Sequence, residues 1–180
     1  MVETLGHRKF IKAMECLESE GALDRTILIN AASLRLLNYR VHTYFIDLLV
    51  QKSYYVKKLE ETKFSPRYEL EPVNLQLAGF PIRAGTVSGN LCSFRHLIKP
   101  YNIYEEVEFK LDEQLKKIKI RPRDYVRKDC DEAIEKLIQG SNEKYWQDLY
   151  SYHKQLEAID FGMHMKQLTL KPHKYLVFED

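Results

Sequence analysis

The chain has 180 residues, of which 44% are hydrophobic and 30% are charged, and its formal net charge is +2. This length fits one domain with a single core, and the balance of hydrophobic and charged residues excludes a disordered tail. A net charge this small does not by itself indicate a polyanionic partner, so an argument for nucleic-acid binding depends on local clusters of basic residues.

The three cysteines, Cys16, Cys92 and Cys130, lie far apart and form no CxxC pair. This spacing argues against a disulfide framework and against a cysteine-rich zinc site. No apolar run approaches the roughly 18 residues of a membrane-spanning helix, and the charged N-terminus lacks the apolar core of a signal peptide. We therefore expect an intracellular protein, cytoplasmic or nuclear, that binds no membrane.

The first 40 residues predict a pair of helices. Apolar residues recur at the spacing of one helical face over residues 8–20, and Gly21 suits the left-handed position that follows a helix. Asp24 is a good capping residue for a second helix over residues 24–37. We expect this pair to pack as an αα-hairpin on a main domain formed by residues 41–180.

The next segment predicts strands. Residues 41–50 carry β-branched and aromatic side chains without a helical stripe, which indicates a buried strand. Residues 72–83 alternate between apolar and polar side chains, as a strand with one buried face does, and a turn is expected at residues 83–85. We predict a mixed sheet in which residues 73–82 and 91–98 form an antiparallel hairpin.

The second half of the chain predicts mainly helices. One helical stripe runs over residues 103–118, although its end, KIKIR at residues 117–121, suits an extended segment equally well. Further helices are expected over residues 123–138 and 142–158. The C-terminal tail holds two short strand candidates on either side of Pro172.

A resemblance to a known family rests on the segment PVNLQLAGFPIRAGTVSGNLCSFRHLIKP. Its order of apolar strand, glycine turn and phenylalanine-containing strand resembles the second and third strands of the RNase H-like exonucleases of the DEDD type. It resembles most the Maelstrom domain, a nuclease-derived module of the piRNA pathway. The resemblance covers residues 41–140 and implies an α+β fold, with an RNase H-like mixed sheet flanked by helices and YFIDLLV as the first strand.

Within YFIDLLV, Asp47 has three interpretations: a solvent-facing or edge residue, a relic of a carboxylate site, or a working metal ligand. In two-metal exonucleases this strand carries Asp-x-Glu, because two ions about 4 Å apart need carboxylates on one face of the strand. Leu49 takes the second position here. Such exonucleases also carry a His-Asn-x-x-x-Asp type element, which would fall near residues 141–150. Asp148 is present there, but no histidine precedes it, because His153 comes after it. We therefore expect no catalytic residue, metal, cofactor or small-molecule substrate.

One local cluster of charge stands out, the run KKIKIRPRDYVRK at residues 116–128. Its cations are suited to neutralising phosphates, and Tyr125 to stacking on a base. The alternative is a solvated face, or pairing with the acidic block of residues 105–113 that precedes the run. The candidate nucleic-acid-binding residues are Lys116, Lys117, Lys119, Arg121, Arg123, Tyr125, Arg127 and Lys128.

Two classes of function follow from these features. The first, implied by the resemblance, is a catalytically inactive RNase H-like module, a pseudo-nuclease that binds RNA, protein partners or both in small-RNA gene silencing. The second is an α+β adaptor subunit of a larger assembly, with no nucleic-acid role, which docks through the N-terminal helices and the 12 tyrosines. An active nuclease ranks third.

Overall fold

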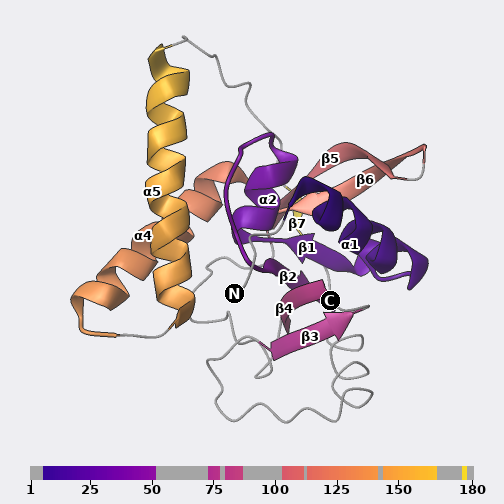
Figure 1. The fold of residues 1–180 in the computed structure, drawn as a ribbon, viewed down its shortest axis with the longest axis horizontal. Helices are drawn as coiled ribbons and strands as arrows, with labels where there is room; N and C mark the ends of the chain where they lie inside the picture. The colour runs from indigo at the N-terminus through magenta and orange to yellow at the C-terminus, as the bar shows by residue number, and fades with distance from the viewer. Residues whose placement is uncertain are drawn as a thin grey trace.

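A computed structural model describes residues 6–51, 73–77, 80–86, 103–111, 113–141, 144–165 and 176–177. In these residues the chain is an α+β protein with helices on both faces of a mixed sheet (Figure 1). The helices are α1 (His7–Ser19), α2 (Asn30–Leu36), α4 (Arg123–Ile138) and α5 (Lys144–Met165), with a 3₁₀ turn, η1, at Leu23–Arg25. The strands are β1 (Thr26–Leu28), β2 (Ile46–Val50), β3 (Val73–Leu77), β4 (Phe80–Thr86), β5 (Ile103–Leu111), β6 (Gln114–Ile120) and β7 (Leu176–Val177). No described helix combines the length and the apolar composition that crossing a membrane requires.

Strand β1 lies at the centre of the sheet, whose order is β3-β4-β2-β1-β6-β5-β7. It runs antiparallel to β2 and parallel to β6, and β2 runs parallel to β4. The helix predicted over residues 24–37 is therefore wrong in its first part, and it begins only at Asn30. Ile27 and Leu28 pack into cores on opposite faces of the sheet, which is the alternation of a strand. Residues 1–40 thus contribute a strand to the same sheet as β2.

The sheet separates two hydrophobic cores. The core on the α1 side holds Phe10, Met14, Leu17, Leu28, Leu48, Val50, Ile118 and Ile120. The core beneath α2, α4 and α5 holds Ile27, Ile29, Leu34, Leu49, Val126, Cys130, Leu149 and Leu156. Full burial of each large aliphatic side chain favours folding by about 1.5–3 kcal/mol, so these layers hold the helices in place.

Strands β5 and β6 form a long antiparallel hairpin, so the helix predicted over residues 103–118 is wrong. The spacing of four between Val107 and Leu111 fits a helix, but it also places both side chains on one face of a strand. The alternation of β5 is clear in its exposed residues, which are Glu106, Glu108 and Lys110. The alternative reading of residues 117–121 as extended chain is confirmed, since β6 runs to Ile120.

Strands β3 and β4 form a second antiparallel hairpin, in which Leu77 lies opposite Phe80. The single strand predicted over residues 72–83 is therefore two strands. The turn predicted at residues 83–85 is wrong, because these residues lie within β4. The expected hairpin partner, residues 91–98, lies outside the described residues.

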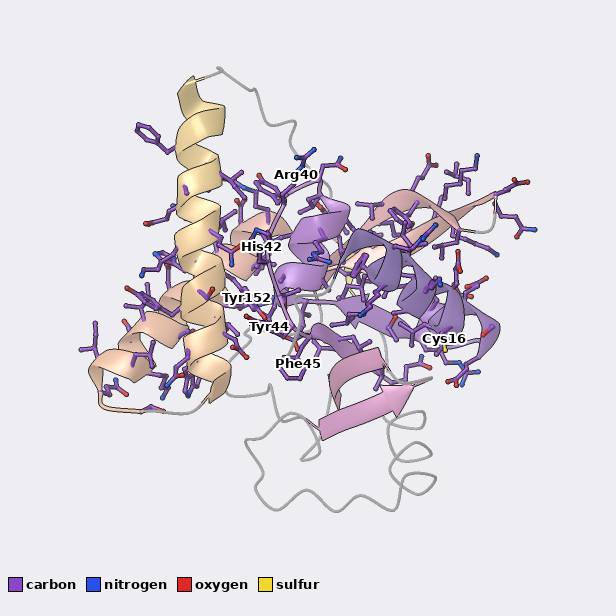
Figure 2. The ribbon with its side chains drawn as sticks, in the orientation of Figure 1. Cys16, Arg40, His42, Tyr44, Phe45 and Tyr152 are labelled. Carbon is purple, nitrogen blue, oxygen red and sulfur yellow. The ribbon has the colours of Figure 1, made fainter. Side chains whose placement is uncertain are left out.

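The segment between α2 and β2 lies along α5. The backbone N–H of His42 donates to Gln155 Oε1 at 2.7 Å, and the Gln155 amide donates back to the His42 carbonyl at 3.2 Å. The hydroxyls of Thr43 and Tyr152 are 2.7 Å apart. Figure 2 labels His42 and Tyr152, which lie where this segment passes α5. Strand β2 therefore begins at Ile46 and not at residue 41 as predicted.

The helices predicted over residues 123–138 and 142–158 are confirmed as α4 and α5, although α5 continues to Met165. They pack against each other and against the α2 side of the sheet. Gly140 follows α4 with a φ of +93°, a backbone conformation that suits glycine after a helix. Their buried side chains include Val126, Cys130, Ala133, Trp146, Leu149 and Leu156.

A buried ion pair joins the end of β6 to α4. Arg121 is 0% exposed, and its Nε and Nη2 donate to the two carboxylate oxygens of Asp129 at 2.5 and 2.9 Å. The Arg121 carbonyl accepts a hydrogen bond from Ser33 of α2 at 2.5 Å, and the Arg121 backbone N–H donates to the Leu28 carbonyl of β1 at 2.8 Å. One residue thus ties β6, β1, α2 and α4 together.

The electrostatics of this pair are governed by burial. Loss of water raises the pKa of the Asp129 carboxyl to about 7, although the Arg121 charge beside it acts in the opposite direction. Removing two charges from water costs several kcal/mol per ion, so the pair adds little net free energy. Either charge left alone in the core would be strongly unfavourable, so the two side chains must stay together. The pair therefore fixes the position of α4 relative to the end of β6.

Replacing Arg121 by methionine should lower the free energy of unfolding by about 3–5 kcal/mol, because Asp129 is then buried without its cation. Adding Asp129→Leu should restore much of that loss, because no buried charge remains. Urea unfolding of the two single variants and the double variant measures both effects. Lys128→Met, at an exposed position of α4, is the matched control. A loss below about 1 kcal/mol for Arg121→Met would contradict this assignment.

Candidate functional site

Asp47 lies inside the sheet and not at an edge. Its strand, β2, runs between β1 and β4, and the residue is 1% exposed. Asn30 of α2 donates from Nδ2 to Asp47 Oδ2 at 2.9 Å. The interpretation of Asp47 as a solvent-facing or edge residue is therefore wrong, because the carboxylate is buried and hydrogen-bonded.

The neighbouring position on the same face of β2 is apolar. Leu49 is buried in the core beneath α2, α4 and α5, where the second carboxylate of a two-metal site would project. Within the described ranges, no group of three or more histidine, cysteine, aspartate or glutamate side chains is placed to hold a metal ion. The relic and working-ligand interpretations of Asp47 both stay predictions.

The lysines on one face of β6 lie opposite carboxylates of β5. In the register of the hairpin, Lys117 faces Glu108 and Lys119 faces Glu106. The Lys119 ammonium group donates to the backbone carbonyl of Asp24 at 3.0 Å. The acidic block and the first part of the basic run therefore lie side by side, and their charges offset each other.

Two further members of the basic run make contacts within the protein. Lys116 lies on the other face of β6, where its Nζ is 2.8 Å from Glu18 Oε1 of α1. Arg121 is fully buried and bound to Asp129. Arg121 therefore cannot contact a phosphate in this structure, and its assignment to a nucleic-acid surface is wrong.

The helical part of the basic run converges on one carboxylate of α5. Arg127 donates from Nη1 to Asp160 Oδ2 at 2.7 Å, and Arg123 Nη2 contacts Asp160 Oδ1. The Arg123 guanidinium also lies 5.7 Å from the centre of the Tyr39 ring. Two cations share one anion here, and the more accessible is Arg127, whose side chain is 41% exposed.

The last two predicted residues lie on α4. Lys128 is exposed. Tyr125 is half-buried, and the guanidinium carbon of Arg121 lies 5.2 Å from the centre of its ring. Tyr125 is thus engaged with a buried cation of its own chain, a contact that competes with stacking on a base.

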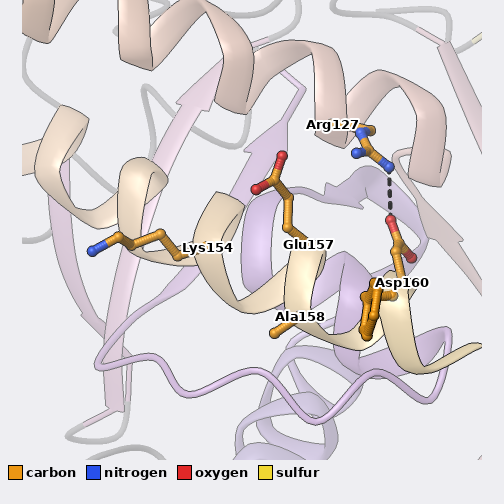
Figure 3. A pocket seen from close by; sticks show the side chains of 6 residues that line it. Arg127, Lys154, Glu157, Ala158 and Asp160 are labelled. Carbon is orange, nitrogen blue, oxygen red and sulfur yellow. Dashed lines mark hydrogen bonds and ion pairs between the residues drawn. The ribbon is translucent and has the colours of Figure 1, made fainter.

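A shallow hollow of about 620 Å³ lies at the Arg127–Asp160 contact, on the outer side of α4 and α5 (Figure 3). Two cations and two carboxylates share its wall with one aromatic ring. Its lining residues are Arg127, Lys154, Glu157, Ala158, Asp160 and Phe161. Because the charges are balanced, the hollow has no strong preference for an anionic ligand.

The exposed face of α5 carries aromatic side chains next to this hollow. Phe161 is 71% exposed and Tyr150 is 38% exposed, and the Lys154 Nζ lies 5.0 Å from the centre of the Tyr150 ring. Residues 150, 154, 157 and 161 are spaced by four, three and four, which places them on one face of a helix. We call Tyr150, Lys154, Glu157 and Phe161 the outer stripe.

The sequence reasoning missed the outer stripe. The helix predicted from the sequence ends at residue 158, so Phe161 lies beyond it. The signal that would have found the stripe is the continuation of the helical spacing from Tyr150 to Phe161.

His153 connects the outer stripe to α4. Its Nε2 is 3.2 Å from Glu157 Oε1, and its Nδ1 is 3.5 Å from Asp131 Oδ1 of α4. Both ring nitrogens therefore lie near carboxylates, one on α5 and one on α4. Glu157 is held at the surface by this contact, with its side chain 55% exposed.

No protein-family model, curated protein or solved structure matches this chain. The α+β class is shown by the structure itself. The finer resemblance to RNase H-like proteins and to the Maelstrom domain stays a prediction.

Replacing Asp47 by alanine should lower the free energy of unfolding by about 1–3 kcal/mol, because the buried Asn30 amide loses its acceptor. Thermal or urea unfolding measures the change. Glu135→Ala removes an exposed carboxylate from α4 and should stay within about 0.5 kcal/mol of the wild type. Equal effects of the two substitutions would show that burial of Asp47 does not matter for stability.

Proposed function

We propose that this chain is a protein-interaction module, a subunit that docks a protein partner through the outer stripe and the hollow beside it. The observation that carries the proposal is the exposure of Phe161 and Tyr150 on a helix whose opposite face is anchored in the core. Aromatic side chains are enriched at protein interfaces, because they bury a large apolar area with few rotatable bonds.

The distribution of charge supports a protein partner over a polyphosphate. The lysines of β6 lie beside carboxylates, Arg121 is buried, and Arg123 and Arg127 share Asp160. Binding to nucleic acid gains its affinity from cations that neutralise phosphates, and carboxylates beside those cations oppose it. A protein surface with its own mixed charges fits this arrangement better. RNA binding and a role in small-RNA silencing stay predictions from the sequence.

The double substitution Tyr150→Ser with Phe161→Ser should abolish the capture of protein partners, because it removes both aromatic side chains of the outer stripe. Chemical crosslinking of the tagged chain in a nuclease-treated cell extract, followed by mass spectrometry, measures the capture. Ile138→Ser is the matched control, since Ile138 is 80% exposed but lies on α4 outside the stripe. The control variant should capture the same proteins as the wild type.

Two outcomes would contradict the proposal. One is the capture of the same proteins by the wild type and the double variant. The other is binding to single-stranded RNA with a steep salt dependence that flattens when Lys117, Arg127 and Lys128 are reversed to glutamate. Arg121 is left unchanged in that reversal, because a buried glutamate beside Asp129 would unfold the protein.

A further inference from the structure

The outer stripe of α5 is complementary to itself. It runs from Tyr150 through Lys154 and Glu157 to Phe161, so an aromatic ring lies at each end and opposite charges lie between them. Side chains at this spacing form one seam along a helix, as in helix pairs of the coiled-coil type. All four residues are exposed.

A second copy of α5, turned antiparallel about a two-fold axis, matches this order. With the axis at the level of residues 155–156, Tyr150 of each copy faces Phe161 of the other, and Lys154 of each faces Glu157 of the other. A two-fold interface makes every contact twice. The stripe therefore provides two aromatic pairs and two ion pairs.

The surroundings of the stripe suit the same arrangement. The Lys154 ammonium group already lies over the Tyr150 ring, and Glu157 is held at the surface by His153. The hollow, with Phe161 in its wall, lies where Tyr150 of the second copy would arrive. A parallel pairing would set Lys154 against Lys154 and Glu157 against Glu157, so like charges oppose that orientation.

We propose that two copies of this chain associate through their outer stripes in the antiparallel, two-fold arrangement. This inference rests on the proposed function, because it uses the same docking surface and names a second copy of the chain as the partner. The charges of the stripe complement those of a second copy of the stripe, which a two-fold axis requires and an unrelated partner does not.

A charge swap tests the proposal on the full chain, with the dimer measured by sedimentation over a range of protein concentrations. Lys154→Glu and Glu157→Lys each create two like-charge contacts in the dimer, so each should weaken dimerisation at least about tenfold. The double variant restores opposite charges across the axis and should recover dimerisation to within about threefold of the wild type. Lys136→Glu, at an exposed position of α4, is the matched control and should leave association unchanged.

The recovery in the double variant distinguishes contact across the axis from an effect within one chain. Each single variant also alters the neighbours of His153 or Tyr150, but that effect would persist in the double variant. A wild type that stays monomeric, or a double variant as weak as the single variants, overturns the proposal. If partner capture depends on Tyr150 and Phe161 while the chain stays monomeric, dimerisation through the outer stripe is contradicted. The proposal that the outer stripe docks a protein partner is then still supported.

Discussion

Arg121 is removed from water completely, and its guanidinium binds Asp129 in the second turn of α4. Because Arg121 follows β6 directly, the pair sets the direction in which the chain leaves the sheet and enters the helix. The position of α4 then brings Arg127 to Asp160 and Asp131 to His153, which orients α5. These three contacts together leave the outer stripe facing away from the sheet.

The other faces of α5 are already engaged. Leu149 and Leu156 lie in the core, Tyr152 contacts Thr43, and Asp160 binds two arginines of α4. A helix held on these sides presents its remaining face with little freedom to rearrange. Side chains on such a face lose less entropy on binding than those of a mobile segment, which favours its use as a docking surface.

Much of the helical layer could be predicted from the sequence, because the buried stripes of α1, α4 and α5 repeat with a helical period over many residues. Strand β1 could not be predicted, since its three residues, Thr26–Leu28, are too few to distinguish the period of a strand from that of a helix. The basic run was read as one surface because a sequence gives the charge of a side chain but not its direction. In the fold, the alternation of β6 sends Lys116 and Lys117 to opposite faces, and Arg121 is buried.

Native-state hydrogen exchange of Arg121→Met against the wild type tests the attachment of the helical layer most directly. If the buried pair holds this layer on the sheet, the amides of α4 and α5 should lose more protection than those of α1 and of the β5–β6 hairpin, because the two helices open as a unit. Equal loss of protection throughout the chain, or a loss confined to the residues next to Arg121, would contradict this account.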